Sequence, residues 1–346
     1  MSCGFFGGNV LKLTEDIGIL KPTFFASVPR LFNKFYDKIN AKLNEATGPK
    51  GWLVQKALAA KLYYLKNGQG YNHKVYDSLI FSKIKAFLGG NVRLMLTGSA
   101  PISGDVLDFL KVVFSCPLCE GYGMTESGGG STITYSDDPQ TGIVGGPLAS
   151  VKIRLRDIPE MNYLSTNEIP QGEVMFKGPC IMPGYYKNKE KTDECLKDGW
   201  LASGDVGQVF PNGSLKIIDR AKNIFKLSQG EYIAPEKLEN MFIKSEWIAQ
   251  IWIYGDSLRD HIISFVVLDL DRIKKYCKET GKENTAAIAE DAELRQIVFD
   301  NIIKLAIENA CISLEKPKQM HLVYDPWTEA MNILTPTQKL KRNIAK

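Results

Sequence analysis

The stretch VRLMLTGSAPISGDVLDFLKVVFSCPLCEGYGMTES, from Val92 to Ser127, alternates short apolar runs with loops that contain glycine. Residues 92–96 have the composition of a short buried strand, and residues 103–114 have the apolar spacing of a helix. A second short apolar run then opens into the glycines of residues 121–123. This order of strand, loop, helix, strand and loop predicts a parallel crossover unit and an α/β fold.

The two loops of this unit, residues 97–101 and 120–126, follow the carboxyl ends of the two strands. Ligands of open α/β sheets bind beyond these ends, so we expect both loops to face one crevice. Glycines and hydroxyl side chains crowd around Glu126, which suggests a loop that holds phosphate. Neither G-x-x-x-x-G-K-[ST] nor a complete G-x-G-x-x-G is present, however, and spacing alone leaves the ligand open.

The segment DVGQVFPNGSLKIIDR, residues 205–220, predicts a β-hairpin because Asn-Gly separates two alternating runs. With Asn212 and Gly213 as the turn, Phe210 would stand opposite Leu215, and Asp205 would stand opposite Arg220. An acid and a guanidinium would then point to one place. The simpler interpretation is a surface ion pair worth about 0.2 to 1 kcal/mol.

Beyond Arg220 the sequence predicts a mixture of helices and strands. The expected helices and strands are helix 235–243, strands 250–254 and 262–268, a helical region at 289–310 and strand 320–324. We interpret this part as a separate α+β domain, so that residues 1–219 and 220–346 form two domains with a hinge near residues 219–225.

The composition is that of a globular chain: 346 residues, 44% of them hydrophobic, with a net charge of +4. The longest apolar runs are strand-sized and do not reach the roughly 18 to 20 residues that cross a bilayer. Seven cysteines without framework spacing indicate a reducing compartment. Cys116 and Cys119 form a C-x-x-C, but no second pair stands at ligand spacing, and a redox or zinc role is disfavoured.

Residues 28–90 are strongly basic, with 11 Lys or Arg against 3 Asp or Glu. Three amphipathic helices are expected here, at 29–46, 52–66 and 75–88, with Gly48 and Pro49 ending the first. Solvated lysines on ordinary helices explain this charge more simply, and peripheral contact with an anionic membrane is the alternative.

Four further motifs indicate a protein family. In chain order they are GYGMTES (121–127), GWLASGDVG (199–207), IIDRAKNIFKLSQGEYIAPEKLE (217–239) and TPTQKLKR (335–342). Together with TGSAP (97–101) and PTFFASVPRLF (22–32), they resemble the adenylate-forming, AMP-binding superfamily. The segment IFKLSQGEYIAPEK resembles the corresponding sequence of the eukaryotic long-chain acyl-CoA synthetases. The resemblance runs essentially end to end.

The resemblance implies a fold and a reaction. The fold would be the C-terminal part of a large adenylate-forming domain, with mixed sheets and flanking helices, followed by a small mobile α+β domain. The reaction would convert a long-chain fatty acid and ATP into an acyl-adenylate, and coenzyme A would then displace AMP. ATP, Mg²⁺ and coenzyme A are the implied cofactors and substrates.

The resemblance also assigns residues to roles. Thr125 would contact the α-phosphate, Glu126 would hold Mg²⁺, and Lys339 would reach the α-phosphate and the acyl oxygen. Asp205 would accept the ribose hydroxyls beside Arg220. The remaining nucleotide contacts would come from two strand ends: Gly98, Ser99, Ala100, Glu120, Gly121, Tyr122 and Gly123. Gly230 and Glu231 would help to form the coenzyme A channel.

One family feature has no counterpart in residues 1–27, namely the Ser/Thr/Gly-rich loop with a lysine that grips the outer phosphates. The chain thus resembles the second half of a synthetase, whose activity alone is open. Two alternatives remain: another acyl- or aryl-adenylating ligase, and an inactive fragment that keeps only the fold.

For partners we expect small molecules and no nucleic acid, with the oligomeric state open. For location we expect an intracellular, reducing compartment, either the cytoplasm or the cytosolic face of a membrane such as the endoplasmic reticulum.

Overall fold

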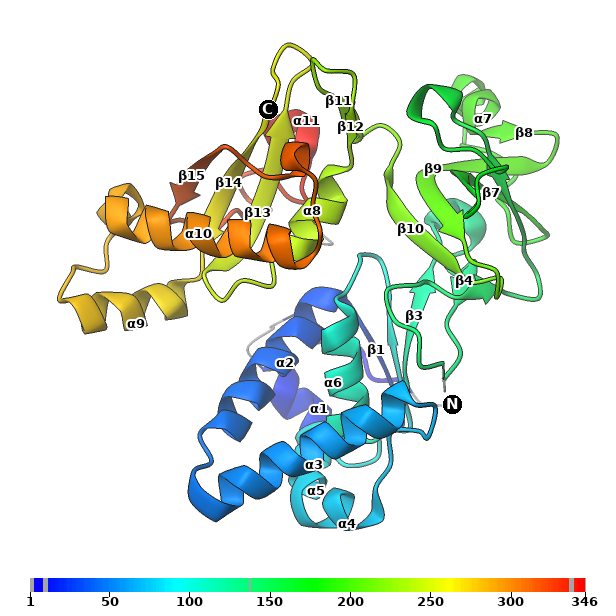
Figure 1. Ribbon diagram of the computed structural model, residues 1–346. Coiled ribbons are helices and arrows are strands. Elements are labelled where there is room, and N and C mark those ends of the chain that lie inside the picture. Colours follow the sequence, from blue (N-terminus) through cyan, green and yellow to red (C-terminus); the bar gives the residue numbers. More distant parts are fainter. Residues whose placement is uncertain (1–2, 9–11, 137, 336–338, 346) are drawn as a thin grey trace. The chain divides into compact units, whose positions relative to one another are not determined.

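The computed structural model describes residues 3–8, 12–136, 138–335 and 339–345, and Figure 1 shows the path of the chain. Two compact units make up the chain. The first comprises residues 1–154, 175–201 and 209–216, and the second comprises residues 155–174, 202–208 and 217–346. Each has a hydrophobic core of its own.

The first unit is built on a five-stranded sheet of order β1-β2-β3-β4-β5. Its strands are β1 (Phe24–Ser27), β2 (Leu94–Thr97), β3 (Leu118–Tyr122), β4 (Thr132–Ile133) and β5 (Gly146–Pro147). β1, β2 and β3 run parallel, and α6 (Gly104–Phe114) connects β2 to β3. The crossover unit and the α/β class predicted from residues 92–127 are therefore confirmed.

Other helices of this unit lie beside α6 and the sheet (Figure 1), and the unit buries a core of Phe, Leu, Ile and Val side chains. These helices are α1 (Leu13–Leu20), α2 (Pro29–Asn44), α3 (Gly48–Lys66), α4 (Lys74–Tyr76) and α5 (Ser82–Phe87). The expected helices are present, but Gly48 and Pro49 begin α3 instead of ending α2. Proline suits the first turn of a helix because the amide there has no intrahelical acceptor.

The third expected helix, residues 75–88, contains a π-helical turn, η1 (Asp77–Phe81), between α4 and α5. This turn packs against α3 through Lys61, whose side chain is fully buried. The Lys61 ammonium donates to the Asp77 carboxylate at 2.5 Å and to Ser115 Oγ at 2.7 Å, and it also bonds to the Val112 carbonyl. The periodicity of the sequence does not reveal this buried charge.

The second sheet has the order β10-β9-β7-β6, and its strands are divided between the two units. These are β6 (Lys152–Arg156), β7 (Gln171–Lys177), β9 (Trp200–Val209) and β10 (Leu215–Arg220), with β8 (Leu196–Lys197) paired to β9. Helix α7 (Lys189–Cys195) precedes β8, and short 3₁₀ turns are η2 (Thr125–Ser127) and η3 (Pro159–Met161).

The second unit contains a sheet in which β13 (Ile248–Gly255) pairs antiparallel with β14 (Ile262–Leu268) and β14 pairs parallel with β15 (Gln319–Val323). α8 (Pro235–Phe242) packs on β13, and α10 (Ala292–Glu308) packs on α8 and β15 (Figure 1). The other elements are β11 (Phe225–Lys226), β12 (Tyr232–Ile233), α9 (Leu270–Thr280), η4 (Ala286–Glu290), η5 (Ser313–Glu315) and α11 (Arg342–Ala345).

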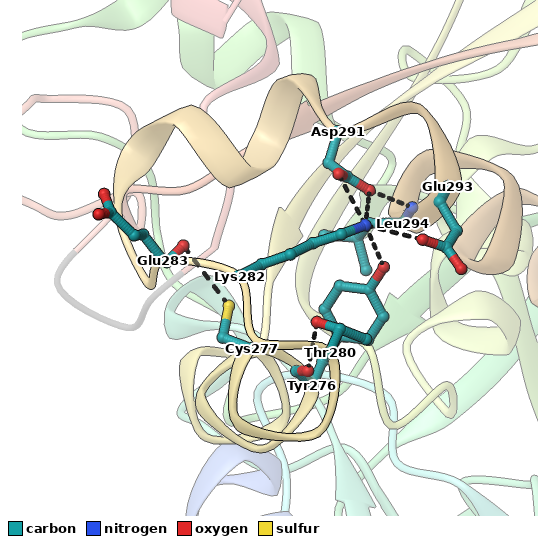
Figure 2. Close-up of polar contacts among 8 residues, drawn as sticks. All are labelled: Tyr276, Cys277, Thr280, Lys282, Glu283, Asp291, Glu293 and Leu294. Atoms are coloured by element: carbon teal, nitrogen blue, oxygen red, sulfur yellow. Dashed lines mark hydrogen bonds and ion pairs between the residues drawn. The ribbon is translucent and has the colours of Figure 1, made fainter.

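Lys282 joins the end of α9 to the start of α10 (Figure 2). Its ammonium contacts Asp291 and Glu293 at 2.8 Å each and the Tyr276 hydroxyl at 3.0 Å. These partners, Asp291 first and Glu293 next, raise the pKa of Lys282. Asp291 is also the N-cap of α10, because its carboxylate accepts from Leu294 N.

Two expectations concern the chain as a whole. The division into domains 1–219 and 220–346 stays a prediction, although the last segment of the second unit begins close by, at Ile217. Within the described residues, every helix is too short or too polar to cross a bilayer.

Candidate active site

The loops after β2 and β3 start side by side, because Thr97 is paired with Glu120 in the parallel register. Their backbones approach so closely that a Cβ on Gly98 would lie 2.9 Å from the Gly121 carbonyl oxygen. Ser99 has φ 71°, a left-handed conformation that is rare outside glycine and is typical of strained functional loops. The structure thus brings together two of the predicted nucleotide-contacting segments.

Gly123 allows the loop after β3 to fold back on itself. A Cβ at this position would lie 2.2 Å from the Gly129 carbonyl oxygen, so only glycine fits without movement of the backbone. Ser131 N donates to the Tyr122 carbonyl at 2.8 Å and closes the turn. The backbone of residues 121–123 is held in place by this arrangement.

Glu120 is buried, with 5% of its surface exposed, and its Oε2 has no hydrogen-bond partner among the described residues. Burial raises the pKa of Glu120 to about 8, while Lys111 acts in the opposite direction. Its carboxyl group is therefore protonated at neutral pH. A nucleotide contact from this residue would come from the main chain.

Thr125 and Glu126 lie in the turn η2, at the end of the same loop. A neighbouring segment of the first unit holds Glu126 at two points: Met182 N donates to its carbonyl at 2.8 Å, and the Tyr185 hydroxyl donates to its Oε1 at 2.7 Å. The carboxylate raises the pKa of Tyr185 to about 12, because it stabilises the neutral phenol. Our sequence reasoning missed Tyr185; only its Gly-Tyr context, at residues 184–185, could have drawn attention to it.

The hairpin formed by β9 and β10 is present, but the predicted turn is wrong. Phe210 N donates to the Ser214 carbonyl at 2.9 Å and Gly213 N donates to the Phe210 carbonyl at 2.8 Å, so Phe210 stands opposite Ser214 and not Leu215. Pro211 and Asn212 occupy the centre of the turn, and Gly213 follows with φ 81°. Proline favours the first central position of such a turn, and glycine then takes the left-handed position.

At the open end of this hairpin, Arg220 Nε lies 3.3 Å from Asp205 Oδ1. The predicted pairing of acid and guanidinium is therefore present despite the changed turn. Ala221 N donates to the Gly204 carbonyl at 2.9 Å, and Gly204 has φ 74°, which marks an irregularity in β9 beside the pair.

Lys339 lies close enough to this pair to interact with it electrostatically. Desolvation is the main cause that lowers the pKa of Lys339, and Arg220 adds to it, whereas Glu236 and Asp205 raise it. The residue as a whole is nevertheless exposed. The second unit thus gathers three predicted site residues, Asp205, Arg220 and Lys339, which are far apart in the sequence.

A buried ionic network supports these three residues. Arg342, which follows Lys339 by three positions, forms an ion pair with Glu239 of α8. Asp219, 1% exposed, accepts from Glu236 N at 2.8 Å and from Arg220 N at 2.6 Å. Burial, and then Glu236, raises the pKa of Asp219 to about 7. The sequence shows these charges, but not that they meet.

Gly230 and Glu231 lie in the tight connection between β11 and β12. Gly230 has φ 95°, and Leu227 N donates to the Glu231 carbonyl at 2.9 Å. Both residues belong to the second unit, like Lys339, whereas Thr125 and Glu126 belong to the first.

The C-x-x-C residues lie in the core of the first unit. In the part of the chain that the structure describes, the seven cysteines form no disulfide, and Cys116 and Cys119 are buried. Burial raises the pKa of Cys116 to about 12, so its thiol is a poor source of thiolate.

The model of the family described as AMP-binding enzyme matches residues 2–186. Among curated relatives, "Long-chain-fatty-acid--CoA ligase 5" of Mus musculus is 43% identical over 98% of this chain and 49% of its own length. "Long chain acyl-CoA synthetase 7, peroxisomal" of Arabidopsis thaliana is 41% identical over 100% of this chain and 50% of its own length. The chain thus spans about half the length of the curated relatives it matches.

Solved structures agree on the fold. The adenylation domain of a carboxylate reductase from Mycobacterium chelonae matches with TM-score 0.74 and 27% identity, over 97% of this chain and 46% of that one. A didomain of carboxylic acid reductase from Segniliparus rugosus, in complex with AMP, matches with TM-score 0.73 and 29% identity. The match covers 97% of this chain and 41% of that one. The predicted fold class is therefore confirmed, and the chain belongs to the AMP-binding enzyme family.

Proposed function

We propose that this chain takes part in the ATP-dependent ligation of a long-chain fatty acid to coenzyme A, through an acyl-adenylate. The relatives that share 41–43% of its residues carry the names of long-chain-fatty-acid ligases and synthetases. The observation that carries the proposal is the gathering of Asp205, Arg220 and Lys339 in one unit.

In the first half-reaction, a carboxylate oxygen of the fatty acid attacks the α-phosphorus of ATP, and the bond to the leaving pyrophosphate breaks. A fatty acid has a pKa of about 4 to 5 and is already ionised, so no general base is required. The site must instead neutralise charge on the α-phosphate. The Lys339 ammonium and the Thr125 hydroxyl take this role, and Asp205 accepts hydrogen bonds from the ribose hydroxyls.

The residues around Glu126 are compatible with Mg²⁺, which binds through one or two carboxylates and completes its shell with phosphate oxygens and water. Glu126 Oε1 accepts from Tyr185, and a cation would bind through Oε2. A bound Mg²⁺ would supply charge neutralisation at the phosphates. Tyr185 keeps the carboxylate oriented for this purpose.

In the second half-reaction, the thiol sulfur of coenzyme A attacks the acyl carbonyl carbon, the bond to AMP breaks, and the thiol proton passes to solvent. Lys339 must withdraw before coenzyme A can approach. A compact ammonium on a flexible stem suits this movement. Rotation at a hinge near residues 219–225 would replace Lys339 with the segment around Gly230 and Glu231.

A second candidate function is nucleotide binding without turnover. The ion pair in which Arg220 Nε lies 3.3 Å from Asp205 Oδ1 favours it, because such a pair can hold the ribose of a nucleotide whether or not adenylation follows. Adenylation of an aryl or another acid is the further alternative, and a panel of acids in the assay below separates it from fatty acid activation.

The test is ATP–pyrophosphate exchange with palmitate, together with AMP binding by calorimetry and thiolysis of supplied palmitoyl-adenylate. We expect Lys339→Ala to lose exchange by at least about 100-fold, as for a group that acts on transition-state charge. It should keep thiolysis. Lys341→Ala is the matched control in the same basic tail, where its ammonium donates to Asn332 Oδ1, and it should keep both.

Three results would change the proposal. Equal loss of exchange and thiolysis in Lys339→Ala would refute its role in the first step alone. AMP binding without exchange for any acid would favour nucleotide binding without turnover. AMP binding that survives Asp205→Asn unchanged would remove Asp205 from the ribose contact.

A further inference from the structure

One face of α3 is exposed and combines aromatic with basic side chains. Five residues recur at intervals of four and three positions and so share one face of the helix: Trp52, Lys56, Ala59, Tyr63 and Lys66. Trp52 is 64% exposed and Tyr63 is 62% exposed. Large aromatic side chains are usually well buried, so two of them on one exposed face indicate a surface that makes contact with something.

The charge of this helix has a single sign. α3 contains four lysines and no Asp or Glu over its 19 residues. One of the four, Lys61, is turned inward to Asp77 and fully buried. The ammonium of Lys56 lies over the Trp52 ring, 4.8 Å from its centroid. Aromatic and cationic groups thus stand together on the outward face.

The surrounding helices strengthen this charge. With the buried pair of Lys61 and Asp77 set aside, ten basic side chains remain in residues 28–90, against two acidic ones, Asp37 and Glu45. Ordinary solvated helix surfaces mix both signs. Residues 28–90 of the first unit therefore carry a net positive charge, and the exposed aromatic rings of α3 belong to this basic segment.

We propose that the α3 face, defined by Trp52, Lys56, Ala59, Tyr63 and Lys66, docks on the surface of an anionic lipid bilayer. Trp and Tyr rings favour the headgroup layer because one end is apolar and the other forms hydrogen bonds. The lysine stems lie along the apolar region while their ammonium groups reach lipid phosphates. The absence of acids in α3 removes the repulsion that an anionic surface would otherwise meet.

This proposal does not rest on the proposed function. It needs only the exposure and the charge of α3, the helix of the first unit that is labelled in Figure 1. A failed ligase assay would leave it unaffected, and a failed docking experiment would leave the ligase proposal unaffected.

The test is co-sedimentation of the full chain with vesicles of phosphatidylcholine containing 30% phosphatidylserine, compared with vesicles of phosphatidylcholine alone. We expect binding to the anionic vesicles that falls steeply with added salt. Since each lysine at such a surface contributes about fivefold in affinity, Lys56→Glu with Lys66→Glu should weaken binding by at least about tenfold. Trp52→Ala with Tyr63→Ala should weaken it as well, but the salt dependence should remain, because the lysines are unchanged.

A matched control exists in the same unit. Lys187 lies over the ring of Tyr186, 5.2 Å from its centroid, and Tyr186 is 87% exposed. Tyr186→Ala with Lys187→Glu therefore removes the same chemistry from another exposed site, and vesicle binding should be unchanged. Circular dichroism checks that every variant is folded.

A second readout locates the contact. Lipids brominated near the headgroup should quench fluorescence of the wild type, and this quenching should be lost in Trp52→Ala although the other four tryptophans remain. Equal binding to neutral and anionic vesicles, no binding to either, or wild-type binding by the Lys56 and Lys66 variant would overturn the proposal. Binding to single-stranded DNA but not to vesicles would overturn it in favour of a nucleic-acid surface.

Discussion

Glu120 illustrates how position alone changes a residue's chemistry. Burial raises its pKa to about 8 from an ordinary value of 4.5. Between these two pH values the folded chain keeps a proton that the unfolded chain has lost. The free energy of unfolding therefore decreases as pH rises through this window, by at most about 1.4 kcal/mol per pH unit from this residue.

We predict that Glu120→Gln removes this pH dependence. Glutamine keeps the shape but does not ionise, so the variant should gain stability over the wild type at pH 8 and much less at pH 5. Urea unfolding at the two pH values measures the difference. Glu45→Gln, at an exposed position, should show no such trend. A Glu120→Gln difference that is the same at both pH values would show that folding does not raise the pKa of Glu120.

Tyr185 supports a second prediction at the residue scale. Its hydroxyl is 2.7 Å from Glu126 Oε1 and orients the proposed Mg²⁺ ligand. Outer-shell partners of this kind change metal affinity by about 10- to 100-fold when removed. Tyr185→Phe should therefore lower the apparent affinity for Mg²⁺ in ATP binding by at least about tenfold. Calorimetric titration with ATP over a series of Mg²⁺ concentrations measures this affinity.

The control for this variant is its neighbour. Tyr186→Phe changes an exposed ring whose contact is with Lys187 and should leave the Mg²⁺ dependence unchanged. If both variants behave like the wild type, Tyr185 is a structural contact of the loop and not a positioning residue.

At the scale of elements, apolar periodicity predicted most helices well and missed what interrupts them. Residues 75–88 form a helical segment as expected, but the π-helical turn η1 places Asp77 toward Lys61. α9 was not predicted, because its sequence, LDRIKKYCKET, is dominated by polar residues. Its buried residues, Ile273, Tyr276 and Cys277, form only a narrow apolar stripe.

We predict that Lys61→Met destabilises the first unit by about 1 to 3 kcal/mol, because it leaves the half-buried Asp77 carboxylate and the buried Val112 carbonyl without their cation. Lys56→Met, on the exposed face of the same helix, should change stability by no more than about 0.5 kcal/mol. Urea unfolding compares the two. Similar effects of the two substitutions would mean that the Lys61 pair makes no special contribution to α3 and η1.

At the scale of the whole molecule, each of the two units contains a large hydrophobic core of its own. One is formed by residues 17–118 of the first unit and the other by residues 227–322 of the second. Leu110 and Leu294 are fully buried members of the first and the second core, respectively. Contacts within each core are dense, so each unit is expected to unfold as its own cooperative element.

We predict two transitions in scanning calorimetry. Leu110→Ala and Leu294→Ala should each cost about 2 to 5 kcal/mol through lost burial and a cavity. Leu110→Ala should lower one transition temperature only, and Leu294→Ala should lower the other. A single transition that both variants shift equally would show that the units unfold together and would weaken the proposed domain division at residues 219–225.

The sequence by itself determined the α/β class, the parallel crossover of residues 92–127 and the family. Strand and helix periodicity are local properties, and the order of the motifs can be read directly from the sequence. It also predicted that Asp205 and Arg220 would meet. Only the tertiary structure decided the turn at Pro211 and Asn212, the protonated interior carboxyl of Glu120, the Tyr185 contact to Glu126 and the approach of Lys339 to Arg220. The physical reason is that desolvation and pairing of charges depend on which distant segments pack together, and no local pattern carries that information.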